Sequence, residues 1–115
     1  ASRPRKGGFR AQAEFVVWAT NGRLEGQVCA PGVFRGRMST INKIHMTQKP
    51  VDVLKGLLAP AGPVVLDPFM GAGSTGVAAL ETGRTFIGCE MVDEYFAAAK
   101  FRLSEASAEL GSEAG

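Results

Sequence analysis

The chain has 115 residues, of which 45% are hydrophobic, and its formal net charge at pH 7 is +2. This length suits one small domain or part of a larger one, and the ordinary apolar content excludes disorder throughout. No apolar stretch approaches the roughly 20 residues of a membrane-spanning helix and no signal-peptide pattern is present, so we expect a cytoplasmic protein with no membrane partner. Two cysteines and one histidine are too few for a structural zinc site, and we predict no metal.

The two halves of the chain differ in charge. Residues 1–55 contain ten basic and three acidic residues, a net +7, whereas residues 56–115 contain three basic and eight acidic residues, a net −5. A basic half joined to an acidic half indicates that a polyanion faces the first half. The alternative is that the basic residues only form a solvated surface. The scattered arginines, taken alone, slightly favour that interpretation.

The first half is expected to hold one strand between two loops. Residues 3–10 are basic, contain glycines and show no periodicity, which is typical of a loop. Residues 14–20 (Glu-Phe-Val-Val-Trp-Ala-Thr) predict a strand that ends at the turn pair Asn21-Gly22. Residues 23–42 are rich in Gly and Arg, so we predict a long loop of the kind that is usually functional or mobile.

The second half is expected to alternate helices and strands. In chain order these are a helix that starts at the 47–50 stretch and runs through 58, a strand at 64–67, a helix at 74–82 capped by Gly83, a strand at 85–90, and a last helix from 92–93. The two strands should be parallel neighbours through a right-handed crossover, which indicates an α/β fold. Cys29 and Cys89 are interpreted as plain thiols, Cys89 being buried in its strand.

The most informative feature lies where the strand at 64–67 ends. Asp67 closes the strand, glycines follow at 71, 73 and 76, and Ser74-Thr75 opens the next helix. Glycines allow the backbone to approach a ligand closely, and a helix N-terminus offers unpaired N–H groups and the positive end of a dipole. Because α/β folds bind ligands at the carboxyl ends of their strands, we predict a cofactor site here.

The glycine spacing alone leaves more than one cofactor open. Gly71-x-Gly73-x-x-Gly76 matches the dinucleotide fingerprint, so an NAD-binding domain is an alternative. Against it, Asp67-Pro68-Phe69 intervenes after the strand, and Glu90 lies somewhat early for the ribose-binding acid. A P-loop is excluded because Val77 stands where its lysine should be. An adenosine ligand fits all of this, since a strand-ending acid can accept both ribose hydroxyls.

Longer stretches around the turn resemble a known family. Asp67-Pro68-Phe69-Met70-Gly71-Ala72-Gly73-Ser74-Thr75 resembles the D-P-F-x-G-x-G-T/S-T segment that binds S-adenosylmethionine in the amino-methylating DNA methyltransferases. Further resemblances, in the family's order, are Phe9–Trp18 with its last sheet motif, His45–Pro50 with its H-x-T-Q-K-P element, and Gly83–Glu90 and Glu94-Tyr95-x-x-x-Ala99-x-x-Arg102-Leu103 with its continuation. The resemblance spans roughly residues 3–104, and the joint spacing is specific.

The resemblance implies an incomplete Rossmann-like, S-adenosylmethionine-dependent methyltransferase fold. The motif order is that of the class in which the catalytic half comes first and the cofactor half last. The implied parts are the end of the catalytic half at 1–22, a short target-recognition and DNA-contact loop at 23–44, the cofactor-binding βαβα half at 45–110, and a disordered tail at 111–115. The chain is interpreted as a fragment, a truncated product or one piece of a split enzyme.

The resemblance also implies roles around the cofactor S-adenosyl-L-methionine. Gly71 and Gly73 would approach its methionine portion, or simply form a tight turn. Asp67 would bind its amino group, or act as a cap. Glu90 would bind its ribose, or be an ordinary exposed acid. Phe69 would shape the pocket floor or be a buried aromatic. The implied cofactor-binding residues are Thr47, Gln48, Lys49, Pro50, Asp67, Pro68, Phe69, Gly71, Gly73, Ser74, Thr75, Glu90 and Met91.

Several of these residues have a simpler interpretation beside the implied one. Thr47, Gln48 and Lys49 would bind the methionine carboxylate, although by spacing they only mark a helix start. Thr75 would bond the same carboxylate or merely cap its own helix. Met91 would pack on the adenine.

DNA contacts are expected in the basic half, and the catalytic residues elsewhere. The candidates for contacts to DNA phosphates or bases are Arg10, Arg23, Arg35, Arg37 and Lys43. Trp18 is expected in the core. The family's Asp- or Ser-Pro-Pro-Tyr tetrad serves the flipped base, but no two of the six prolines here are adjacent. We therefore predict no catalytic residue in this chain and a missing catalytic half as its partner.

The implied function is methyl transfer from S-adenosylmethionine to an exocyclic amine of double-stranded DNA, with adenine N6 favoured over cytosine N4. Restriction–modification, phage and regulatory roles stay open. Alone, the chain is expected to bind cofactor weakly, to catalyse nothing and to self-associate through open sheet edges. The alternatives are a non-catalytic nucleic-acid- and cofactor-binding module and the NAD-binding domain.

Overall fold

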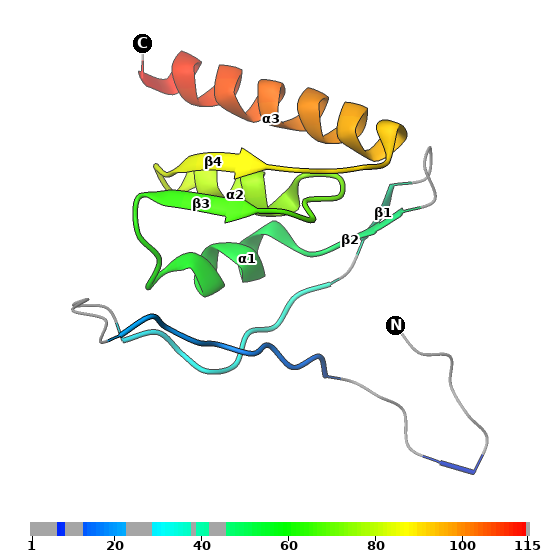
Figure 1. Cartoon of the computed structure of the whole chain (residues 1–115), viewed down its shortest axis with the longest axis vertical. Helices are drawn as coiled ribbons and strands as arrows, with labels where there is room; N and C mark the ends of the chain where they lie inside the picture. The colour runs from blue at the N-terminus through cyan, green and yellow to red at the C-terminus, as the bar shows by residue number, and fades with distance from the viewer. Residues whose placement is uncertain (1–6, 9–12, 23–28, 38, 42–45, 115) are drawn as a thin grey trace.

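The computed structural model describes residues 7–8, 13–22, 29–37, 39–41 and 46–114. In chain order its elements are β1 (Ser39–Ile41), β2 (Met46–Gln48), α1 (Val51–Leu58), β3 (Val64–Asp67), α2 (Ser74–Glu81), β4 (Thr85–Gly88) and α3 (Asp93–Ala114) (Figure 1). From β3 onward the chain is a βαβα unit, so the predicted α/β class is confirmed. No helix within the described ranges combines the length and apolar character needed to cross a membrane.

β3 and β4 form the parallel pair that the sequence predicts. Val64 lies opposite Thr85, and Asp67 lies opposite Gly88. Beyond the strand ends, the N–H of Cys89 donates to the carbonyl of Asp67 at 3.0 Å, and the N–H of Met70 donates to the carbonyl of Cys89 at 2.9 Å. These bonds hold the two segments that leave the sheet side by side.

α2 covers one face of this sheet and lies between α1 and α3, in contact with both (Figure 1). Ala78, Ala79 and Ala99 are fully buried. Because their side chains are small, the packed elements lie close together. A Cβ at Gly76 would lie only 2.5 Å from Leu103 Cδ2 and 2.7 Å from the Phe86 ring. Glycine therefore lets α2 approach α3 and β4 at once.

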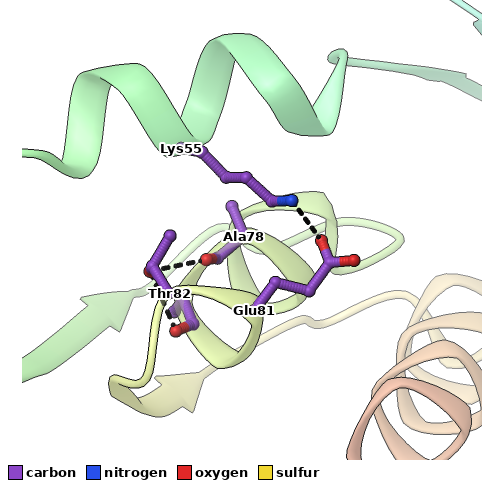
Figure 2. Close-up of polar contacts among 5 residues, drawn as sticks. Lys55, Ala78, Glu81 and Thr82 are labelled. Carbon is purple, nitrogen blue, oxygen red and sulfur yellow. Dashed lines mark hydrogen bonds and ion pairs between the residues drawn. The ribbon is translucent and has the colours of Figure 1, made fainter. Parts of the chain in front are cut away.

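An ion pair connects α1 to α2. Lys55 Nζ lies 3.1 Å from Glu81 Oε2, and both side chains are about one-third exposed (Figure 2). The hydroxyl of Thr82 donates to the carbonyl of Ala78 at 2.8 Å (Figure 2). It also donates to the carbonyl of Ala79 at 3.1 Å. The backbone N–H of Thr82, the C-cap of α2, also donates to both carbonyls at 3.2 Å, so the hydroxyl adds a second donor at the end of the helix.

The face of the sheet opposite α2 is uncovered within the described structure. Val64, Leu66 and Ile87 are 56%, 62% and 52% exposed, whereas Val65 is 8% exposed. Because successive strand residues point to opposite faces, the three exposed residues share one face, which we call the open sheet face. Parallel sheets are normally covered on both faces. In the described residues this sheet has a covering layer on one face only.

The predictions for the first half are partly wrong. Residues 14–20 form no strand, and Phe15, Val17 and Trp18, the last expected in the core, are exposed. A strand needs a paired neighbour, and in the described residues only β1 with β2 and β3 with β4 are paired. Part of the predicted 23–42 loop, Ser39–Ile41, pairs antiparallel with Met46–Gln48, where β-branched residues favour strand. Residues 23–28, 38 and 42–45 lie outside the described ranges.

The second half differs from the sequence prediction in three details. α1 begins at Val51 with Pro50 as its N-cap, so Thr47 and Gln48 belong to a strand rather than to a helix start. Cys89 follows β4 and is exposed instead of buried. α3 extends through Ala114, where a frayed tail was expected, because the alanines, leucine and glutamates of its last turns are strong helix formers.

Candidate functional site

The turn between β3 and α2 is built on two glycines in left-handed conformations. Gly71 has a φ of +55° and Gly73 a φ of +86°, values that other residues adopt only with strain. Residues 70–74 are all buried. Gly73 is the N-cap of α2 and offers no side-chain cap to the first turn of the helix. The positive end of α2 therefore faces the turn without a side-chain acceptor from its cap.

Close packing against α3 is a second reason why the turn requires glycine. A Cβ at Gly73 would lie 3.1 Å from Cβ and 3.3 Å from Cα of Ala99. At the end of β4, a Cβ at Gly88 would collide with the sulfur of Met70. The turn is thus seated between β4 and α3, and its backbone has little room to move.

Two carboxylates at the carboxyl ends of the paired strands flank the turn. Glu90, after β4, accepts a hydrogen bond from the N–H of Gly71 at Oε1 (3.0 Å) and from the N–H of Val92 at Oε2 (2.9 Å). Asp67, at the end of β3, accepts from the N–H of Phe69 at 3.0 Å. The structure therefore brings together Asp67, Gly71, Gly73 and Glu90, which the sequence placed at one site.

Arg102 of α3 reaches the same turn. Its Nη1 donates to the carbonyl of Ala72 at 2.7 Å and lies 3.2 Å from Oγ of Ser74. Burial lowers the pKa of Arg102 because the guanidinium loses water, yet the group remains charged at any ordinary pH. Sequence reasoning assigned Arg102 no role, although its place beside Ala99 and Leu103 in one motif was a usable signal.

Apolar side chains beside the turn are exposed rather than buried. Phe69 is 88% exposed and Met91 is 96% exposed. Exposed residues of this size and type, adjacent to a buried polar turn, are the kind of surface that another molecule covers. The alternative interpretation of Phe69 as a buried aromatic is therefore wrong, whereas Pro68, Ser74 and Thr75 lie in the turn and the start of α2 as expected.

The 47–50 stretch is not joined to the turn by any hydrogen bond or ion pair among the described residues. Lys49 Nζ instead lies 2.6 Å from Glu14 Oε1, and this lysine lowers the pKa of the Glu14 carboxyl. The side-chain oxygen of Gln48 is buried without a hydrogen-bond partner in the described part of the chain. An acceptor of that kind would be satisfied by an N–H from a bound molecule.

The predicted DNA contacts fall partly outside the structure. Arg35 and Arg37 are exposed on the segment that follows Phe34, whose ring packs against Gly56 of α1. That contact holds the segment against the folded part of the chain. Arg10, Arg23 and Lys43 lie outside the described residues.

Comparison with known proteins points to one family. Residues 17–101 match the N6/N4 methyltransferase family, described as DNA methylase. The type II methyltransferase M1.MboII of Moraxella bovis is 39% identical over 92 residues, covering 74% of this chain and 35% of that protein. YubD of Escherichia coli (strain K12), which bears the name of a methylase, is 46% identical over 66 residues, covering 55% and 29%.

Similar chains are also found among solved structures. The crystal structure of an M1.HpyAVI–SAM complex is 44% identical, with a TM-score of 0.47, and the match covers 49% of this chain and 29% of that one. This chain thus spans about a third of the length of the relatives that it matches.

Proposed function

Because this chain belongs to the family of N6/N4 DNA methylases, which it matches over residues 17–101, we propose that it supplies the S-adenosylmethionine pocket of a DNA methyltransferase. One observation supports this most directly. The glycine turn after β3 is buried, adopts two left-handed glycine conformations and is flanked by carboxylates at the ends of adjacent parallel strands. This is where a doubly wound sheet binds an adenosine-containing ligand.

The proposed roles follow from the position of each group. Gly71 and Gly73 carry no side chain, so their backbone would lie close to the methionine portion, and Asp67 would accept from its ammonium group. The carboxylate of Glu90 is oriented by two backbone N–H donors and has lone pairs left for the ribose hydroxyls. Phe69 and Met91, both exposed, would cover the adenine.

The opposite wall of the pocket is proposed to come from the 47–50 stretch. Lys49 and Gln48 would hold the methionine carboxylate, which requires Lys49 to exchange its exposed contact with Glu14 for the ligand. Exposed ion pairs contribute little to stability because water screens both charges, so a ligand carboxylate can compete for this lysine. Ser74 and Thr75 would add their helix-start N–H groups.

The methyl acceptor is proposed to be an exocyclic amine of double-stranded DNA, with adenine N6 ahead of cytosine N4. When bound, S-adenosylmethionine supplies a methyl group activated on a sulfonium. The Asp- or Ser-Pro-Pro-Tyr tetrad expected to position the amine does not occur among the 115 residues of this chain. We assign it to a separate catalytic part, and this chain would bind cofactor but transfer no methyl group alone.

Calorimetric titration with S-adenosylhomocysteine tests the cofactor assignment. We expect saturable binding to the chain and a large loss of affinity in Asp67→Ala, with Asp52→Ala, an exposed acid of α1, as the matched control. NAD in excess should not displace the ligand. Displacement by NAD would contradict the assignment and favour the nicotinamide alternative, whereas equal affinity in both variants would contradict the role given to Asp67.

The enzymatic part of the proposal has its own test. Mixing the chain with the catalytic half of a relative should yield methylated DNA, measured as radiolabel transferred from S-adenosylmethionine, and neither part alone should. A second candidate, the non-catalytic module, would bind DNA with affinity that falls steeply with salt and give no product in any mixture.

A further inference from the structure

Arg102 makes a contact that the proposed function does not use. It projects from the middle of α3, yet one guanidinium nitrogen serves two acceptors of the glycine turn, the Ala72 carbonyl at 2.7 Å and the Ser74 hydroxyl at 3.2 Å. Ser74 is buried, and the guanidinium is partly so. Hydrogen bonds from a charged donor in a partly buried setting are stronger than neutral ones. The contact is therefore a substantial constraint on the turn.

The hydrogen bonds of the turn hold its peptide units unequally. The unit between Met70 and Gly71 is held at both ends, because its carbonyl accepts from the N–H of Gly73 at 2.9 Å and its N–H donates to Glu90 at 3.0 Å. In the unit between Ala72 and Gly73, the N–H is held by Met70 and the carbonyl by Arg102. Among the described residues, no hydrogen bond holds the unit between Gly71 and Ala72.

We propose that Arg102 is a positioning residue for cofactor binding: by fixing the Ala72–Gly73 peptide unit, it holds the glycine turn, whose Gly71–Ala72 unit has no hydrogen bond of its own among the described residues, in the shape that the ligand requires. This inference rests on the proposed function. Arg102 would not touch the cofactor, and it would act through the backbone of the turn. The charge also adds a positive field to a site that receives a carboxylate-bearing ligand, and in the described residues it is not cancelled by an ion pair.

Apolar side chains other than Arg102 also hold α3 on the turn and on α2. α3 packs on the turn and on α2 through Ala99 and Leu103, against Gly73 and Gly76. Residues 99, 102 and 103 lie on one face of the helix. Removing the guanidinium should leave this apolar contact in place and change the turn, whereas a merely structural residue would change the stability and leave the folded turn as it was.

The experiment compares Arg102→Met with Lys100→Met, an equal loss of charge at an exposed position of the same helix. Two properties are measured: S-adenosylhomocysteine affinity by calorimetry, and the amide resonances of Gly71 and Gly73 in the ligand-free, ¹⁵N-labelled chain. We expect Arg102→Met to bind about tenfold more weakly, a factor equivalent to about 1.4 kcal/mol, and to shift the glycine amides. Lys100→Met should do neither, and Arg102→Lys should recover part of the affinity.

Each outcome decides the matter. Affinity within about twofold of the unaltered chain would overturn the proposal, and so would glycine amides that do not shift. If the unaltered chain binds no S-adenosylhomocysteine, the proposed function fails, and the glycine amides alone then decide the role of Arg102. If Arg102→Met does not fold, Ser74→Ala, which removes one of the two acceptors, must shift the same amides for the proposal to stand.

Discussion

At the residue scale, Glu90 connects the two strand ends through hydrogen bonds to Gly71 and Val92. In Glu90→Gln one acceptor becomes an NH₂ donor that faces a backbone N–H donor. The N–H of Gly71 is partly buried and that of Val92 is exposed, so leaving one of them unpaired costs less than the roughly 1–3 kcal/mol of a fully buried group. We predict a slightly lower free energy of unfolding and weaker binding of S-adenosylhomocysteine. Urea denaturation and calorimetry measure the two effects. Glu105→Gln, an exposed change on α3, should alter neither, and a Glu90→Gln protein indistinguishable from it would refute the prediction.

The Glu14–Lys49 pair predicts a pH dependence. The hydrogen bond from Lys49, and then its charge, lower the pKa of Glu14 in the folded chain. The contribution of the pair to stability is therefore present above the unfolded pKa and is lost as the pH falls through the lower, folded pKa. A carboxyl titration by ¹³C NMR should give Glu14 a midpoint below that of exposed glutamates. Lys49→Met should return that midpoint to its ordinary value; an unchanged midpoint would rule the pair out in solution.

Which residues could be predicted depends on how far apart in the sequence their partners lie. Asp67, Gly71 and Gly73 follow one another closely, so strand–turn–helix chemistry identifies them. Arg102 reaches the turn across 28 to 30 residues, and Lys49 reaches Glu14 across 35. Local pattern carries no signal for such pairs, and this is why neither the Lys49–Glu14 ion pair nor the contact of Arg102 with the turn was predicted.

At the element scale, two helical glycines with opposite surroundings give a matched test of the packing of α2. A Cβ at Gly76 would meet Leu103 and Phe86 at 2.5 and 2.7 Å, whereas at Gly111 in α3 nothing lies within 4 Å. We predict that Gly76→Ala destabilises by about 1–3 kcal/mol through overpacking. Gly111→Ala should stabilise by up to about 1 kcal/mol through helix propensity. Thermal unfolding compares the two, and a stabilising Gly76→Ala would contradict the described packing.

The elements that the sequence predicted are those whose partners adjoin them in the chain. β3, α2, β4 and α3 pack on one another within about 50 residues, so periodicity, turn chemistry and the βαβ rule agree on them. The strand expected at 14–20 has the right composition but no paired neighbour in the described structure, and composition alone does not make a strand. β1 and β2 were missed because three-residue strands carry too little periodicity to be recognised.

At the scale of the whole molecule, the uncovered sheet predicts self-association. Val64, Leu66 and Ile87 form the open sheet face, and an unpaired strand edge beside an apolar face invites pairing with another chain. This exposure fits a chain that buries its second sheet face against a partner, which we propose is the catalytic part of the enzyme.

Light scattering over a range of concentrations tests self-association through the open sheet face. The apparent mass of the isolated chain should rise with concentration, and Leu66→Lys should reduce the rise by placing a charge on the open sheet face. Val33→Lys makes the same change at another exposed position and should have little effect. A constant monomer mass at high concentration would show that the open sheet face does not mediate association.

We propose that the glycine turn after β3 binds the adenosine cofactor, and NMR can locate the binding site residue by residue. The ¹⁵N-labelled chain is titrated with S-adenosylhomocysteine while all amide resonances are followed. We predict saturable shifts centred on Asp67 to Thr75 and on Glu90 to Val92, with the largest at Gly71 and Ala72. Saturable shifts centred instead on the groove between β4 and α3, lined by Phe96, Leu103 and Ser107, would contradict the claim, as would a folded chain that shows no shifts at all.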